Sequence, residues 1–153
     1  MEKETMKTVL FVCTANQCRS PMAEGMFRKM LADKGKADVR VESAGISRTD
    51  TSPATDEAVK AMRRRGIDIR QHASRHVTKR IADGASLILV MTKNHREMLA
   101  QLYPDCQQKT FMLSEYAEGK ELDVPDPVGL DIEAYGIVAA LLERFLRQVA
   151  EKV

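Results

Sequence analysis

The feature that most constrains this chain is an apolar run near the N-terminus that stops abruptly at a cysteine. Residues 8–12 read Thr-Val-Leu-Phe-Val, Cys13 follows, and five residues separate it from Arg19, Ser20 and Pro21. Bulky and β-branched apolar residues without polar alternation predict a strand that is buried on both faces. A serine followed by a proline predicts the start of a helix, with Ser20 as its N-cap. The stretch therefore predicts a strand, a tight loop and a helix.

A loop of this kind is suited to hold a small anion. The backbone N–H groups of residues 14–19 and the N-terminus of the helix point at one spot, which suits a phosphate-sized dianion. The same field favours the thiolate form of Cys13, which is the nucleophilic form of cysteine. Taken alone, Cys13 would be a small buried hydrophobe and Arg19 a surface charge. Their combination at this spacing predicts phosphoryl transfer through cysteine.

Composition restricts the protein to a few classes. At 153 residues the chain suits a single domain, residues 1–153. A formal net charge of +2 is too small to indicate nucleic acid or a membrane as the main partner. No apolar run approaches the ~20 residues of a membrane span, and none fits a signal peptide. Three cysteines fit no disulfide framework, so we expect a cytoplasmic protein.

Strands and helices alternate along the rest of the chain. Further strands are expected at 39–43, 86–91 and 109–113, and helices at 20–33, 54–65, 92–103 and 131–151. A long loop is expected from 114 to 130, and 67–80 has no clear assignment. This alternation predicts an α/β three-layer sandwich with a four-stranded parallel sheet in the order 2-1-3-4, flanked by helices. The loop after the first strand then lies at the switch point, where such sheets bind ligands.

Phosphate ester cleavage also needs an acid, because the leaving oxygen must be protonated as it departs. Asp126 is the best candidate, since Pro125 and Pro127 restrict the backbone on both sides and would hold its carboxylate in place. An ordinary Asp-Pro turn is the plainer interpretation of the same residues. Asp123 is a weaker competitor for the role of acid.

The chain resembles the low-molecular-weight protein tyrosine phosphatases. The resemblance rests on Val-Cys-Thr-Ala-Asn-Gln-Cys-Arg-Ser-Pro-Met-Ala-Glu at 12–24, on the Ser-Ala-Gly at 43–45, on 69–75 and on Asp126-Pro127. It covers essentially the whole chain. The Cys-x5-Arg-Ser motif occurs in other cysteine phosphatases too, but its place at the first strand, with a late Asp-Pro, is specific to this family.

The resemblance implies a role for each residue of the motif. Cys13 would form a cysteinyl-phosphate, Arg19 would bind two equatorial phosphoryl oxygens, and Asp126 would act first as acid and then as base. Ser20 would hydrogen-bond the sulfur. The phosphate would be bound by the backbone of the loop, at Thr14, Ala15, Asn16, Gln17, Cys18, Arg19 and Ser20.

The family also implies supporting residues behind the loop. Asn16 would be held in a strained backbone conformation by Ser20, Ser43 and His72. Cys18 matches a loop cysteine that pairs reversibly with the nucleophile under peroxide, and a small packing residue is an equally good interpretation of it. The other two histidines, at 76 and 95, are expected at the surface.

The match to the tyrosine-specific members is incomplete at the mouth of the pocket. Where they carry aromatic residues this chain has Thr49 or a neighbour, and Val128-Gly129 after Asp-Pro. Each missing aromatic partner removes stacking of ~0.5–1.5 kcal/mol with a phosphotyrosine ring. The ending also resembles a bacterial branch that dephosphorylates arginine, although Gln17 replaces that branch's typical threonine. We expect a protein-tyrosine phosphatase, and the alternative is a protein arginine phosphatase of the same fold.

Two other classes are weaker interpretations. Thiol-linked arsenate reductases share the fold, but they need two further cysteines, and residues 72–105 contain none. A non-catalytic phosphoprotein-binding module would lack the nucleophile or the acid, and both are present. We expect phosphorylated protein as the partner, inorganic phosphate or another oxyanion as an occupant of the loop, and no metal or cofactor.

Overall fold

The structure, a computed structural model, describes residues 6–47 and 51–153. Its four parallel strands are β1 (Lys7–Cys13), β2 (Val39–Gly45), β3 (Leu87–Val90) and β4 (Thr110–Met112), in the order β2-β1-β3-β4. The predicted order 2-1-3-4 is confirmed. β1 therefore lies between β2 and β3, with Cys13 opposite Gly45 on one side and Val12 opposite Val90 on the other.

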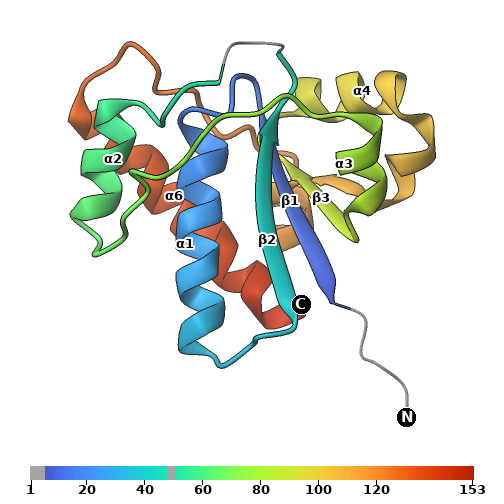
Figure 1. Ribbon diagram of the computed structural model, residues 1–153, viewed down its shortest axis with the longest axis horizontal. Helices are drawn as coiled ribbons and strands as arrows, with labels where there is room; N and C mark the ends of the chain where they lie inside the picture. Colours follow the sequence, from blue (N-terminus) through green and yellow to red (C-terminus); the bar gives the residue numbers. More distant parts are fainter. Residues whose placement is uncertain (1–5, 48–50) are drawn as a thin grey trace.

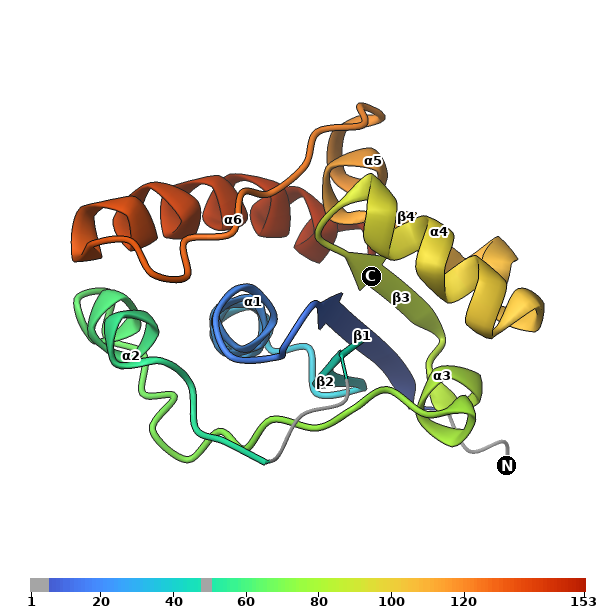
Figure 2. The ribbon, with the colours of Figure 1, turned by 90° about the horizontal axis from the view of Figure 1, so that it is seen from above.

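Helices cover both faces of this sheet (Figures 1 and 2). One face carries α1 (Arg19–Asp33), α2 (Asp56–Arg63), α5 (Leu113–Glu118) and α6 (Ile132–Lys152). The other carries α3 (Lys79–Gly84), α4 (Lys93–Leu102) and the 3-10 helix η1 (Pro104–Lys109). This is the predicted three-layer arrangement. No helix in the described ranges is long and apolar enough to cross a membrane.

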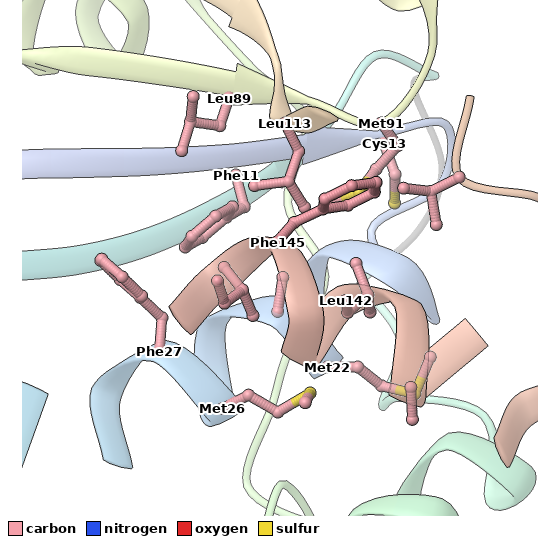
Figure 3. Close-up of a cluster of buried hydrophobic side chains, with 14 of the residues drawn as sticks. Phe11, Cys13, Met22, Met26, Phe27, Leu89, Met91, Leu113, Leu142 and Phe145 are labelled. Carbon is pink, nitrogen blue, oxygen red and sulfur yellow. The ribbon is translucent and has the colours of Figure 1, made fainter. Parts of the chain in front are cut away.

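The side chains of β1 are divided between two apolar clusters, as the uninterrupted apolar run predicts. Val9, Phe11 and Cys13 pack under α1 and α6, whereas Leu10 and Val12 pack under α3 and α4. The rings of Phe11 and Phe27 meet edge to face with centroids 5.5 Å apart. Figure 3 shows Cys13 among the apolar side chains of the first cluster. Cys13 is therefore anchored in the packed core at the carboxyl end of β1.

The predicted cap of the first helix is wrong. The N-cap of α1 is Cys18, whose side chain makes no capping hydrogen bond to the helix, and Ser20 lies in the first turn. Pro21 is then the third residue of the helix, where its missing N–H costs nothing because the first four are unpaired anyway. The hydroxyl of Ser20 instead lies within hydrogen-bond distance of the sulfur of Cys13.

Two short α-helices and the 3-10 helix η1 lie where no helix was predicted. α5 occupies the start of the expected loop 114–130, because Glu115 accepts a hydrogen bond from the N–H of Met112 (3.1 Å) and Gly119, at φ +72°, ends the turn. α3 lies at the end of the unassigned stretch 67–80, with Thr78 as its N-cap. α2, α4 and α6 begin and end within two residues of their predicted bounds, and Thr55, Thr92 and Asp131 are their N-caps.

Candidate active site

A small cavity of about 180 Å³ opens at the carboxyl end of β1, where the chain passes through residues 14–18 into α1. Its lining residues are Cys13, Thr14, Ala15, Gln17, Cys18, Arg19, Asp126 and Val128. The loop thus lies next to the switch point of the sheet, as the order of the strands predicts. The candidate nucleophile, arginine and acid all reach one cavity.

Ser20 lies directly against the candidate nucleophile. Its Oγ is 3.0 Å from Cys13 Sγ, and both residues are buried. Asn16 Nδ2 donates to the same Oγ at 2.7 Å. Because that bond occupies a lone pair of the hydroxyl, the hydroxyl proton is free to point at the sulfur. In this arrangement the hydroxyl of Ser20 can donate a hydrogen bond to the sulfur of Cys13.

Asn16 holds the shape of the loop from within. It is the non-glycine residue with positive φ in the described chain, at φ +59°, and it is fully buried. Its Nδ2 also donates to Ser43 Oγ (2.9 Å), and its Oδ1 accepts from the N–H of Arg75 (3.0 Å). His72 Nε2 donates to its carbonyl oxygen at 2.7 Å. These contacts from β2 and from 72–75 offset the cost of the left-handed backbone, as the resemblance implies.

Glu24 supports this network from α1. Its Oε1 accepts from Ser43 Oγ at 2.8 Å and lies 3.7 Å from His72 Nδ1. Burial opposes the charged form, but hydrogen bonds from His72 and Ser43 and the charge of Arg28 outweigh it, so the pKa of Glu24 is lowered. A carboxylate at this position fixes the orientation of the His72 ring.

Gly45 leaves room for the loop at the end of β2. A Cβ at this position would lie 2.8 Å from the carbonyl oxygen of Thr14 and 2.9 Å from the carbonyl carbon of Ala15. Two backbone hydrogen bonds run alongside, from Ile46 to Cys13 (3.0 Å) and from Ser47 to Thr14 (2.8 Å). The loop backbone therefore packs directly on glycine. The sequence resemblance included Gly45 but gave it no role.

Arg19 is buried, and three groups hold its guanidinium. Nη1 donates to the carbonyl oxygen of Val124 at 2.9 Å. Nη2 donates to Thr14 Oγ1 at 3.4 Å and lies 3.5 Å from Asp126 Oδ2. A guanidinium held in this way is pre-organised, so it need not reorder to meet an anion.

The two candidate acids point to different places. Asp126 lines the cavity with its side chain 42% exposed, and its Oδ1 accepts from the N–H of Val128 at 3.0 Å. Asp123 Oδ1 instead accepts from the N–H of Lys93, the first residue of α4, at 2.9 Å. The structure therefore places Asp126, rather than Asp123, at the cavity.

Cys18 packs against two hydroxyls from other elements. Its Sγ lies 3.3 Å from Tyr135 Oη and 3.6 Å from Thr55 Oγ1. Burial raises the pKa of the Cys18 thiol, and it also raises the pKa of Tyr135 to about 12. Both groups are protonated near neutral pH. The three cysteines are free thiols in the structure.

His95 does not lie at the surface. It is buried, with 4% of its area exposed, and its Nε2 lies 2.9 Å from Thr14 Oγ1. The prediction is wrong because the end of β3 neighbours that of β1, so the first turn of α4 faces the loop. The strand order was the signal that could have located it. His76 is half-buried beside Gly45, with which it forms an isolated bridge.

Thr49, expected near the pocket, falls outside the described residues. Gln17 and Val128 line the cavity, and no residue of its lining is aromatic among those that the structure describes.

Comparison with known proteins identifies the family. The sequence profile described as low molecular weight phosphotyrosine protein phosphatase matches residues 8–153. The chain belongs to this family. Among curated members of the family, a protein-arginine-phosphatase from Bacillus subtilis is 38% identical over 145 residues, which are 95% of each chain.

Two solved structures of other proteins share the fold of this chain. The low molecular weight protein tyrosine phosphatase from T. tengcongensis superposes with a TM-score of 0.92 at 38% identity, over 96% of this chain and 99% of that one. A cysteine-to-serine variant of the YwlE arginine phosphatase with a phosphorylated active-site serine superposes with a TM-score of 0.91 at 36% identity, over 95% of this chain and 94% of that one. Family members thus include proteins named for either substrate, and one carries phosphate on the residue that replaces its cysteine.

Proposed function

We propose that this family member hydrolyses phosphorylated side chains of proteins through a cysteinyl-phosphate intermediate, and that residues 1–153 act as one phosphatase domain. The observation that carries the proposal is the convergence of Cys13, Arg19 and Asp126 on one small cavity. A thiol, a pre-organised guanidinium and a partly exposed carboxyl group are the three groups that two-step phosphoryl transfer through cysteine needs.

In the first step the sulfur of Cys13 attacks phosphorus in line with the leaving group. The S–P bond forms as the bond to the leaving atom breaks, and Asp126 donates its proton to that atom. Arg19 and the loop N–H groups of residues 14–20 bind the equatorial oxygens, where negative charge gathers in the transition state. Free phosphate or a similar oxyanion would occupy the same loop.

In the second step water releases the phosphate. Asp126, now a carboxylate, takes a proton from the water. The oxygen of that water bonds to phosphorus as the S–P bond breaks. The thiolate of Cys13 leaves, and the hydroxyl of Ser20, 3.0 Å away, stabilises it by hydrogen bonding. Asn16, Ser43 and His72 act indirectly, by holding the loop in the shape that receives phosphate.

Release of phosphate from para-nitrophenyl phosphate, between about pH 5 and 7, tests this chemistry. We expect turnover by the wild type and none by Cys13→Ser. Absence of turnover by the wild type would contradict the proposal.

For the substrate we propose phosphotyrosine, which is the substrate class for which the family is named. The protein would act on phosphorylated proteins in the cytoplasm, where its three free thiols persist.

Protein phosphoarginine is the second candidate, and the lining of the cavity favours it. Gln17 and Val128 line the cavity and offer no aromatic ring on which a phosphotyrosine could stack, whereas the side-chain amide of Gln17 could hydrogen-bond a guanidinium. The similarity to proteins named arginine phosphatases adds support. With this substrate Asp126 would protonate the leaving nitrogen.

A comparison of kcat/KM on matched phosphotyrosine and phosphoarginine peptides distinguishes the candidates. We expect Val128→Tyr to raise kcat/KM for phosphotyrosine by about two- to tenfold, as one stacking partner is gained. Gln17→Thr tests whether the amide contributes to recognition of arginine. A wild type that prefers phosphoarginine tenfold or more would exclude phosphotyrosine as the main substrate.

A further inference from the structure

His95 is the buried histidine that the phosphatase mechanism above does not use. It lies in the first turn of α4, and two contacts hold that turn in place. Thr92 Oγ1 accepts from the N–H of His95 at 3.1 Å, and Asp123 Oδ1 accepts from the N–H of Lys93 at 2.9 Å. The imidazole is therefore carried on a fixed backbone, and Asp123 belongs to the same segment as Asp126.

The ring makes one polar contact and leaves its other nitrogen without a partner. Nε2 lies 2.9 Å from Thr14 Oγ1, while Nδ1 is buried and has no hydrogen-bond partner among the described residues. A buried polar atom left unpaired destabilises the folded state. An apolar side chain at position 95 would avoid this cost, but it could not make the polar contact to Thr14. That contact is therefore what distinguishes His95 from an apolar residue at this position.

Thr14 in turn contacts Arg19, the arginine that lines the cavity. Arg19 Nη2 is 3.4 Å from Thr14 Oγ1, and a guanidinium only donates, so this oxygen accepts from Arg19 whichever way its proton points. Thr14 is itself exposed, and its hydroxyl would turn freely without a second partner. His95, in the first turn of α4, is that partner.

The charge state of the imidazole suits this arrangement. Burial, followed by the positive charge of Arg19, lowers the pKa of His95 to about 4, against the smaller opposing effect of Asp123 and Asp126. The ring is neutral at the pH of the reaction. It therefore adds no second cation beside Arg19 and does not compete with it for the anion.

We propose that His95 is a positioning residue of this site: it holds the hydroxyl of Thr14 against Arg19, so that the guanidinium keeps the orientation that binds the phosphoryl group in the transition state. The inference rests on the proposed phosphatase function. Three parts of the chain, far apart in the sequence, then position one arginine: the loop after β1 through Thr14, the segment 123–126 through Val124, and α4 through His95.

The test compares four variants on para-nitrophenyl phosphate. His95→Leu keeps the volume but removes the contact, and His95→Gln places an amide where Nε2 lies. Thr14→Val removes the hydroxyl, and the fourth variant combines His95→Leu with Thr14→Val. Glu97→Gln, on an exposed position of the same helix, is the control for α4.

We expect His95→Leu to lower kcat about tenfold with little change in KM, because the contact acts on transition-state charge. His95→Gln should recover most of the loss, and the double variant should be no slower than Thr14→Val alone. The proposal is overturned by His95→Leu activity within twofold of wild type, by losses that multiply in the double variant, or by equal loss in His95→Gln and His95→Leu.

Two further measurements keep the result interpretable. If His95→Leu does not fold, Thr14→Val, which changes an exposed side chain, tests the same contact and must lower kcat by a similar factor. If the wild type does not turn over para-nitrophenyl phosphate, the proposed function fails. The role of His95 is then tested separately, by calorimetric measurement of orthovanadate binding. His95→Leu should then weaken binding of vanadate about tenfold, and unchanged binding would refute it.

Discussion

Arg19 donates through Nη1 to the carbonyl oxygen of Val124 at 2.9 Å, across 105 positions of sequence. Val124 lies two residues before Asp126, and its own N–H donates at 2.8 Å to the carbonyl oxygen of Met91, the residue that follows β3. The segment that carries the candidate acid is therefore attached both to the sheet and to the arginine of the loop. This attachment sets where the carboxyl group of Asp126 can reach.

Asp126→Asn should slow ester hydrolysis most for substrates with poor leaving groups, because those need a proton most. We expect a loss of about 10²–10⁴-fold for the phenols of highest pKa and a steeper dependence of kcat on leaving-group pKa. A series of substituted phenyl phosphates provides the measurement. Asp123→Asn, which keeps an oxygen for the N–H of Lys93, is the control, and a slope unchanged in Asp126→Asn would show that Asp126 is not the acid.

Cys13→Ser should abolish turnover but leave the loop able to bind inorganic phosphate. The alcohol is a far weaker nucleophile than a thiolate, whereas the loop N–H groups and Arg19 are unchanged. Steady-state kinetics and calorimetric titration with phosphate measure the two effects. Cys106→Ala, at a buried cysteine under the other face of the sheet, should retain activity. Equal loss in both variants would mean that Cys13 acts through folding only.

Gly45→Ala should damage both stability and activity. Its Cβ would meet the backbone of Thr14 and Ala15 at 2.8 and 2.9 Å, and backbone atoms cannot move aside as a flexible side chain can. We expect a fall of about 1–3 kcal/mol in the free energy of unfolding, measured in urea, with a parallel fall in kcat. Gly84→Ala is the matched control, since a Cβ there meets nothing within 4 Å. If both variants are as stable as the wild type, the loop does not pack on Gly45 as described.

His95 should make the protein less stable in acid. Its pKa is about 4 in the folded state against an ordinary value of 6.5, so below pH 6.5 the unfolded chain takes up a proton that the folded chain does not. The free energy of unfolding therefore falls as the pH drops from 6.5 towards 4, and this contribution stops growing below 4. Relative to His95→Gln, the wild type should lose about 2 kcal/mol more between pH 7 and 4.5 in urea unfolding. Parallel curves for the two proteins would mean that His95 is not held neutral.

The local elements of the site could be predicted because their signals lie within short windows of sequence. Residues 8–21 predict a buried strand, a loop and a helix from apolar patterning and from Pro21, and all three are present. The stripe from Tyr135 to Val149 on α6 is buried as its helical spacing requires. Asp126 could be found because the prolines on both sides distinguish it from other acidic residues.

The error at Ser20 arose because its hydroxyl had two possible sets of hydrogen-bond partners. Ser20 has the pattern of an N-cap, but tertiary structure brings Asn16 and Cys13 within reach of its hydroxyl, and these bonds replace the cap. α5 escaped prediction because a six-residue helix is too short for periodicity to show.

The sequence by itself determined the fold class, the order of the strands and the position of the loop that carries the Cys-x5-Arg-Ser motif, since these follow from the alternation of strands and helices and from contiguous residues. Tertiary structure alone decided which distant groups complete the site. Gly45 supports the loop, Asp126 rather than Asp123 faces it, and His95 meets Thr14 across 81 positions. Such contacts depend on which strand ends lie side by side and on how closely two backbones approach. Those distances are set by packing of the whole chain, and no local window of sequence contains them.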